Sequence, residues 1–269
     1  MLRLLPLLLA LASGAALAQS APADSAAVQD STAAPEAART ATPFPPLAAP
    51  LAGVVWTAPD SLPLAVADLE AMRRAGIRAV RTELVEEGVL RAADRLGIAV
   101  AQTLPIADFP APALSRLLPE AEALFTEALD RARPHASARL FILARGVDTS
   151  DPRAQPFFER LTALARERGA AGTRTAYLTR FVDDDCADAG VDLVLLDARG
   201  QDPFDLLRRW RATHDTPVGL GAWSAGVVPG REGGWRRSGT LAHQARTIET
   251  TLNRFATGDA PPGRRPLAG

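Results

Sequence analysis

From residue 51 onward, short apolar runs alternate with longer segments in which apolar residues recur every three or four positions. The apolar runs predict seven strands, at residues 51–56, 79–83, 98–104, 140–144, 175–181, 191–197 and 217–223. Most of these runs are apolar on both faces, which is typical of parallel strands that are covered by helices. The pattern therefore predicts a parallel sheet whose strands are each followed by a helix.

The helical segments support this order. The most regular is the last one, where the apolar positions are Leu241, Ala245, Ile248, Leu252 and Phe255, with spacings of four, three, four and three. Seven repeats of strand and helix favour an α/β fold of the parallel (β/α) TIM-barrel type over a doubly wound sheet. The residues after Phe255 carry no pattern for an eighth unit. We therefore expect an open barrel edge that a loop or a partner must cover.

The composition outside the predicted barrel suggests export. Residues 1–18 combine Arg3, a Leu- and Ala-rich run and a small-residue site that ends at Ala18, which predicts a cleaved signal peptide. Residues 19–50 are rich in Ala, Pro and Ser and predict a disordered linker, residues 51–258 the barrel, and residues 259–269 a disordered tail. We expect a periplasmic or secreted protein with no membrane segment after cleavage.

Charge and residue usage exclude several kinds of chemistry. The 30 basic and 31 acidic residues give a net charge of -1, which does not favour nucleic acid as a partner. All the basic residues are arginine, so Schiff-base lysines and phosphate-loop lysines are excluded. Cys186 and three scattered histidines lack metal-ligand spacing, and we expect no metal site and no cofactor.

Candidate functional residues stand where predicted strands end, because the active sites of such barrels lie at that face. Carboxylates occur there as Glu83, Asp148 and Asp197. Trp56 and Trp223 also stand at strand ends, where an aromatic ring can stack on the apolar face of a sugar. The acidic run at 183–185 could bind a cation, but we favour a solvated turn.

Two stretches resemble the first units of the catalytic barrel of family 2 glycoside hydrolases and their clan relatives. They are DLEAMRRAGIRAVRTE at 68–83 and LRAADRLGIAVAQTLP at 90–105. Arg78 stands where the family usually has Asn. Segments 138–148, 216–225 and 243–252 are similar to strand four, strand seven and the helix that follows strand seven. The matching positions in the first two stretches are Met72, Gly76, Val80, Arg81, Asp94, Gly97, Ile98 and Val100.

The resemblance implies positions for the two catalytic carboxylates of the family. Asp148 stands for the general acid/base glutamate, and Val147 for the asparagine before it. Ala222 stands for the nucleophilic glutamate. Retaining hydrolysis needs two carboxyl groups about 5–5.5 Å apart, and alanine supplies none. A substitute would have to come from Glu83, Asp197 or Glu232.

The other site residues also have structural interpretations. The resemblance places Arg81 near the nucleophile, but Arg81 could instead form a salt bridge with Glu83 or Asp148. Asp148 could cap the following helix, although Ser150 or Asp151 fits that role better.

The sequence thus predicts an exported, glycoside-hydrolase-like barrel that is catalytically degenerate and binds carbohydrate or a partner protein. The predicted catalytic residue is Asp148, and the predicted binding residues are Arg81, Glu83, Asp197, Trp223 and Trp56. One alternative is an active glycosidase that cleaves O-glycosyl bonds with Asp148 as acid/base. Another is a structural subunit that a partner chain or a second copy completes at the open barrel edge.

Overall fold

The computed structural model describes residues 53–184, 186–224, 226 and 228–256. The predicted signal peptide and linker, and the predicted tail, lie outside the described residues. Between residues 53 and 256, the strands and helices follow one another in the predicted order, with one exception. The described residues between the strands Arg174–Thr179 and Leu193–Asp197 form no helix, so the prediction that a helix follows every strand was wrong at this position.

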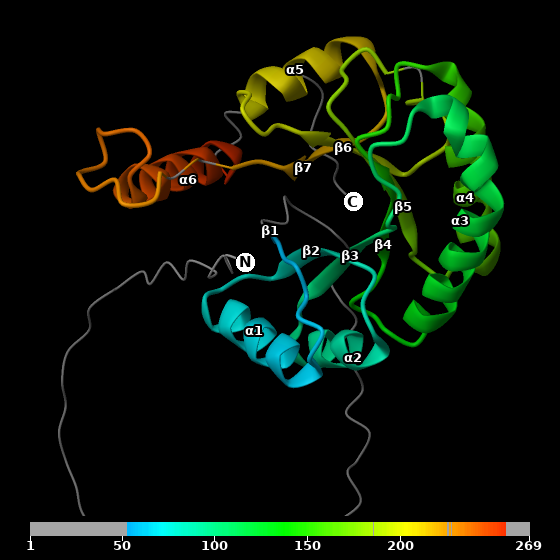
Figure 1. Cartoon of the computed structure of the whole chain (residues 1–269), viewed down its shortest axis with the longest axis horizontal. Coiled ribbons are helices and arrows are strands. Elements are labelled where there is room, and N and C mark those ends of the chain that lie inside the picture. Colours follow the sequence, from blue (N-terminus) through cyan, green and yellow to red (C-terminus); the bar gives the residue numbers. More distant parts are fainter. Residues whose placement is uncertain (1–52, 185, 225, 227, 257–269) are drawn as a thin grey trace, which may run out of the picture. The chain divides into compact units, whose positions relative to one another are not determined.

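The strands form one parallel sheet in which each strand pairs with the next along the chain. The sheet curves into a nearly closed barrel, with β1 and β7 as its two ends (Figure 1). The predicted seven-unit barrel is confirmed, and no eighth strand is present among the described residues. The strands are β1 (Gly53–Val55), β2 (Ala79–Glu83), β3 (Ala99–Thr103), β4 (Leu140–Arg145), β5 (Arg174–Thr179), β6 (Leu193–Asp197) and β7 (Val218–Ala222).

Each predicted helical pattern falls within a helix. A short 3-10 turn, η1 (Pro152–Ala154), precedes the fourth helix, and the Asp151 side chain caps it by accepting a hydrogen bond from the Arg153 N–H at 3.0 Å. This confirms the prediction that a residue after Asp148 provides the cap. The helices are α1 (Leu62–Arg74), α2 (Glu87–Leu96), α3 (Ala111–Ala132), α4 (Gln155–Arg168), α5 (Pro203–Thr213) and α6 (Leu241–Ala256).

The core has two layers, because successive strand residues point to opposite faces of the sheet. Inside the barrel lies a small cluster of Ile142, Ala176, Leu178 and Leu195. The larger cluster lies between strands and helices and holds the largest buried rings. There, the rings of Phe125 in α3 and Phe141 in β4 meet edge to face at 5.4 Å. The side chains buried between the strands and the helices thus supply most of the apolar stabilisation.

Asp94 and Gly97, which belong to the motif shared with the glycoside hydrolases, have structural roles. Asp94 in α2 accepts a hydrogen bond from the Ser137 N–H at 2.8 Å, and its other oxygen lies 2.6 Å from His135 Nδ1. Gly97 ends α2 with a φ of 63°, a left-handed conformation that glycine adopts without strain. Gly97 thus forms the turn from α2 into β3, and Asp94 links α2 to the segment before β4.

The acidic run at 183–185 differs in part from its prediction. Asp183 is exposed, but Asp184 is buried and accepts hydrogen bonds from the Tyr177 hydroxyl at 3.0 Å and the Cys186 N–H at 2.8 Å. Burial raises the pKa of both Asp184 and Tyr177. The prediction of a solvated turn was therefore wrong for Asp184, which forms hydrogen bonds in the core. Asp185 lies outside the described residues.

The described part of the chain shows neither a membrane-spanning helix nor a metal-binding cluster. None of its helices has the length and apolar character needed to cross a bilayer. Nor do three or more His, Cys, Asp or Glu side chains in that part gather in a way that could hold a metal ion.

Candidate functional site

Strand geometry places four charged side chains together at the carboxyl ends of the strands. Arg81 and Glu83 in β2 alternate with the buried Val80 and Thr82, which pack toward the helices, so the two charged residues share the inner face. Asp197 in β6 shares a face with Leu195, which lies in the inner cluster. A register shift in β4 pairs Arg145 with Leu178, another inner residue. We call this group, Arg81, Glu83, Arg145 and Asp197, the mouth cluster.

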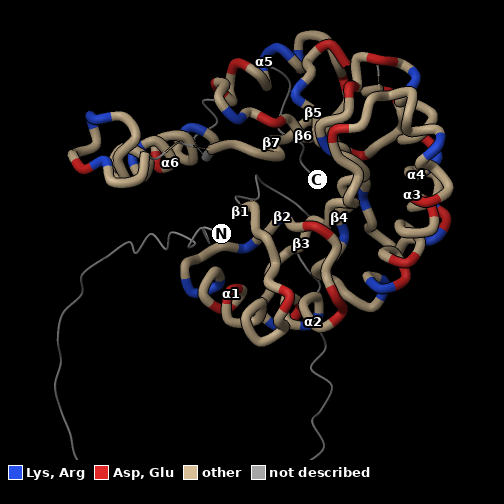
Figure 2. The backbone as a smooth tube through the Cα atoms, in the orientation of Figure 1, with Lys and Arg blue, Asp and Glu red and all other residues tan. Residues whose placement is uncertain are grey.

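Two of the acids at the mouth are held by arginines. Arg145 lies 3.4 Å from Glu83. Both oxygens of Asp197 accept hydrogen bonds from Arg199 Nε, at 2.8 and 3.0 Å. Figure 2 shows that residues of both signs are interspersed along the described chain, in agreement with its small net charge.

Arg81 differs from these arginines, because it forms no hydrogen bond or ion pair with a described residue. Its Nε is buried and has no partner. The predicted salt bridges with Glu83 and Asp148 are not formed, since Glu83 pairs with Arg145 and Asp148 bonds elsewhere. Burial lowers the pKa of Arg81, and Arg145 lowers it further, whereas Asp197 raises it. Arg81 is thus a half-buried cation in the mouth cluster without a counter-ion in contact.

Thr103, on the strand next to β2, carries a second unsatisfied group. It is the register partner of Glu83 on β3, and β3 is the neighbour of β2. Its side chain is almost fully buried, and its Oγ1 has no hydrogen-bond partner among the described residues. Buried polar atoms are normally paired, and Arg81 Nε and Thr103 Oγ1 are two of six buried side-chain atoms that have no hydrogen-bond partner among the described residues.

The end of β7 carries Ala222, which is buried. Ala222 is the register partner of Asp197 in β6, and its carbonyl accepts a hydrogen bond from the Ala198 N–H at 2.8 Å. Asp197 is therefore the carboxylate on the neighbouring strand at this level. Burial would raise the pKa of Asp197, but its hydrogen bonds from Arg199 outweigh that effect and hold the pKa below its usual range. Glu232, the other candidate beyond β7, is exposed in the loop before α6.

Asp148 lies after the end of β4 and is exposed. Its Oδ1 accepts hydrogen bonds from the Ser150 N–H at 3.1 Å and the Ser150 hydroxyl at 2.5 Å. Its carboxylate therefore closes a local turn of the chain. The Val147 side chain beside it is buried in the core and offers no amide to a ligand. A catalytic role for Asp148 remains a prediction.

The two candidate tryptophans are also placed by the structure. Trp56 is buried among the core residues, and its Nε1 donates a hydrogen bond to Asp68 of α1 at 3.1 Å. Trp223 is half-buried and packs against the same core. The structure thus brings Arg81, Glu83 and Asp197 together, but turns Trp56 toward α1.

Arg145 and Thr103 are candidate site residues that the sequence did not single out. Arg145 ends an apolar strand, so the rule that strand ends carry the chemistry could have found it. The sequence did not indicate Thr103, because threonine is common in strands. Only the unpaired side-chain oxygen in the structure distinguishes it.

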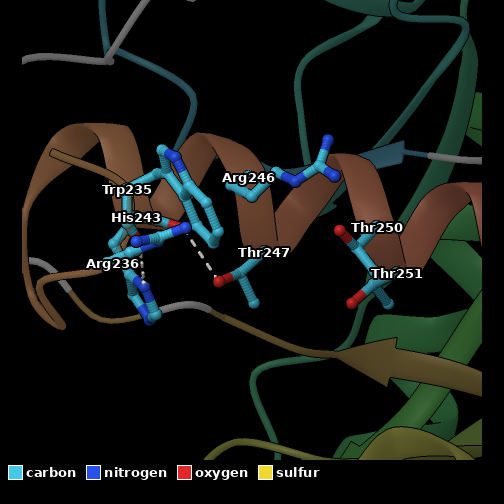
Figure 3. Close-up of a pocket in the computed structure, with 7 residues that line it drawn as sticks. All are labelled: Trp235, Arg236, His243, Arg246, Thr247, Thr250 and Thr251. Atoms are coloured by element: carbon cyan, nitrogen blue, oxygen red, sulfur yellow. Dashed lines mark hydrogen bonds between the residues drawn. The ribbon is translucent and has the colours of Figure 1, made fainter.

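Two surface hollows lie apart from Ala222. One, of about 300 Å³, lies between the end of β2 and α3 and includes Glu83 and Arg131. The other, of about 410 Å³, runs along α6, where the guanidinium of Arg236 lies 5.0 Å from the centre of the Trp235 ring (Figure 3). The second hollow is lined by Trp235, Arg236, His243, Arg246, Thr247, Thr250 and Thr251.

Comparison with solved structures defines the class of fold: a TIM-type barrel like those of glycoside hydrolases. The chain is similar to a β-glucuronidase from Ruminococcus gnavus in complex with D-glucaro 1,5-lactone, with a TM-score of 0.66 and 16% identity, covering 78% of this chain and 41% of that one. It is also similar to a family 2 β-galacturonidase from Eisenbergiella tayi bound to galacturonate, with a TM-score of 0.66 and 14% identity, covering 76% of this chain and 41% of that one.

Other comparisons found no match: no protein-family model and no curated protein sequence matches the chain. The chain spans about two fifths of the length of the solved enzymes that it resembles. At these identities the likeness shows the fold alone, and the resemblance to the family 2 barrel is confirmed at that level.

Proposed function

We propose that this protein is an exported barrel that binds carbohydrate at the carboxyl ends of its strands and does not cleave glycosidic bonds. The observation that carries the proposal is the methyl group of Ala222 at the end of β7, where the resemblance implies a nucleophilic carboxylate. A retaining glycosidase cannot form its covalent intermediate without that group.

Two of the remaining acids support binding over catalysis. Both oxygens of Asp197 are bound by Arg199, which makes the carboxylate a poor nucleophile. Asp148 bonds to Ser150 in its own turn. Export is part of the proposal because of the signal-peptide pattern at residues 1–18.

Carbohydrate binding without turnover can be measured with two assays. Neutral and acidic trisaccharides should change the tryptophan fluorescence in a saturable way, while a panel of nitrophenyl glycosides should release no nitrophenol above the buffer rate. Trp223→Phe should remove most of the fluorescence change, because Trp223 directly follows β7. Trp235→Phe, in the hollow along α6, is the matched control and should keep it. Turnover that Asp148→Asn abolishes would refute the proposal.

A second function, assembly with a second copy of the chain, is favoured by the distribution of exposed apolar side chains. Apart from Phe109, the large ones among the described residues belong to β1 and α1 or to the segment after β7, that is, to the first and last units of the sheet. On one side are Val55, Leu62 and Leu64, and on the other are Val228, Trp235, Leu241 and Leu252. The uncovered edge and the uncovered face of α6 belong to the same chain. A second copy can therefore supply both halves of the contact.

If copies associate through this edge, the mass in solution should rise with protein concentration toward that of a dimer. Leu252→Asp should return the protein to a monomer, because it places a charge in the apolar face of α6. Phe109→Asp, at the exposed apolar residue away from the edge, should leave the dimer intact. Sedimentation velocity measures both, and a monomer at all concentrations would refute this function.

A further inference from the structure

A hollow of about 410 Å³ lies along α6, and it shares no residue with the mouth cluster. All of its lining residues lie between positions 235 and 251, so α6 and the loop directly before it form the hollow by themselves (Figure 3). On α6 the lining includes positions 243, 247 and 250, which lie about half a turn from the apolar positions 245, 248 and 252. The hollow is therefore on the face of α6 opposite its apolar side chains.

Hydrogen bonds hold the loop against the start of α6. The ring of His243 donates from Nδ1 to the Trp235 carbonyl at 2.9 Å. The hydroxyl of Thr240, which is 1% exposed, accepts from the His243 N–H at 3.1 Å and donates to the Arg237 carbonyl at 3.0 Å. Trp235 itself is 55% exposed. These contacts fix an exposed aromatic residue at one end of the hollow.

The hollow is surrounded by positive charge. No acidic residue lines it. Residues 228–256 carry five arginines and two glutamates, although the whole chain has a net charge of -1. The guanidinium of Arg236 lies 5.0 Å from the centre of the Trp235 ring, and Arg236 forms no ion pair within the described part of the chain. This charge distribution favours an anionic ligand.

Two threonine hydroxyls in the hollow are not used by the helix. A threonine inside a helix commonly bonds to a backbone carbonyl one turn earlier, as Thr247 does to His243 at 2.8 Å. Thr250 and Thr251 form no such side-chain bond to any described residue. Thr251 is only 9% exposed, but its oxygen is not among the fully enclosed unpaired atoms. Both hydroxyls can therefore donate to a ligand in the hollow.

We propose that this hollow binds an aromatic anion, that is, a planar ring that carries a carboxylate, phosphate or sulfate group. The ring contacts the indole of Trp235 and the flat guanidinium of Arg236, both of which stack on aromatic rings. The anionic group binds Arg246 and the hydroxyl of Thr250, which are neighbours on the surface of α6 because they are four residues apart. A hollow of this volume suits a small molecule.

Arg246 is available to such a ligand. Its partner, Glu249, lies at 2.9 Å, and both side chains are exposed. Exposed ion pairs contribute little, so an anion in the hollow can replace Glu249 at small cost. The site goes beyond the proposed function, because it lies outside the barrel mouth and uses none of the residues there.

The test is ¹⁹F NMR of the whole chain labelled with 5-fluorotryptophan. The chain has four tryptophans, and the Trp235 signal is assigned by its loss in Trp235→Phe. The probes are benzoate, phenyl phosphate and phenyl sulfate, with benzyl alcohol as the neutral ring and inorganic phosphate as the anion without a ring. We expect at least one aromatic anion to shift the Trp235 signal saturably, and the two control probes to bind at least about tenfold more weakly. The three aromatic anions show which anionic group is preferred.

Three variants assign the anionic group. Arg246→Gln should weaken binding of the best aromatic anion by at least about tenfold, the loss expected for one charge-assisted hydrogen bond. Glu249→Gln breaks the same ion pair but keeps the cation, and should bind at least as tightly as the parent. Arg91→Gln, at an exposed arginine of α2 that pairs with Glu87, should bind like the parent. Each variant should unfold at a temperature close to that of the parent.

Several results would overturn the inference. One is a Trp235 signal that no aromatic anion shifts, and another is equal binding of phenyl phosphate and either control probe. Equal losses in Arg246→Gln and Glu249→Gln would show that the ion pair matters for the shape of the helix and that Arg246 does not hold the anion. A shift of the Trp223 signal without one of Trp235 would place the anion at the barrel mouth. None of these results decides carbohydrate binding at the mouth, which is measured through Trp223.

Discussion

Trp210→Ala should lower the free energy of unfolding by about 3–5 kcal/mol, the range for removing a large aromatic ring from a packed core. Trp210 is completely buried in α5, and its Nε1 donates a hydrogen bond to the Thr216 carbonyl at 3.2 Å. Its ring also lies 4.2 Å from that of His214. The substitution leaves a cavity at α5, the helix that packs against β7, and it leaves the Thr216 carbonyl without its hydrogen bond. Urea denaturation measures the change.

A conservative variant separates the two contributions. Trp210→Phe keeps most of the ring packing but loses the hydrogen bond, and should cost about 1–2 kcal/mol. Arg208→Ala, at an exposed position of the same helix, should have little effect because surface ion pairs contribute little. A loss below about 1 kcal/mol for Trp210→Ala would contradict the packing described for α5.

Asp94→Ala should lower the free energy of unfolding by about 2–4 kcal/mol, because it leaves buried groups without partners. Asp94 binds His135 Nδ1 and the Ser137 N–H, and the other ring nitrogen of His135 already lacks a partner among the described residues. His135 is almost fully buried, so water cannot replace the carboxylate freely. Thermal and urea unfolding of the variant measure the loss.

Asp130→Ala is the matched control for this prediction. Asp130 is exposed and pairs with Arg133 at 3.0 Å on the surface of α3. Its removal should change stability by less than about 0.5 kcal/mol. Equal effects of the two substitutions would show that Asp94 does not link α2 to the segment before β4.

The order of the strands and helices could be predicted from the sequence because each element buries one continuous set of apolar side chains. The run at 191–197 and the spacing that ends at Phe255 carry that signal directly. The buried position of Asp184 could not be predicted, since an acidic triplet gives no sign that the Tyr177 hydroxyl lies beside it. Such contacts depend on tertiary packing, which apolar periodicity does not report.

The candidate site was predicted in part. The strand-end rule indicated Glu83 and Asp197, the family resemblance indicated Arg81, and the structure brings these residues together. It did not indicate which charges neutralise one another, because that depends on strand register and on the shift in β4 that turns Arg145 inward. The same limit explains Trp56, which stands at a strand end but turns toward Asp68.

The balance of groups at the mouth supports the proposal that the barrel binds without cleaving. A hydrolytic site needs one acid that is free to attack and one that is free to donate a proton. Here Asp197 is bound by Arg199, Asp148 is bound by Ser150, and β7 ends in Ala222. Glu83 pairs with Arg145, while Arg81 Nε and Thr103 Oγ1 have no hydrogen-bond partner among the described residues.

The most direct test of the absent nucleophile is the intact mass of the protein after incubation with 2-deoxy-2-fluoro glycosyl fluorides, which trap the covalent intermediate of retaining glycosidases. We predict that the mass stays that of the unmodified chain after prolonged incubation with glucosyl, galactosyl and glucuronyl reagents. An added glycosyl group that disappears in Asp197→Asn would contradict the account, because it would show that a neighbouring strand supplies the attacking carboxylate.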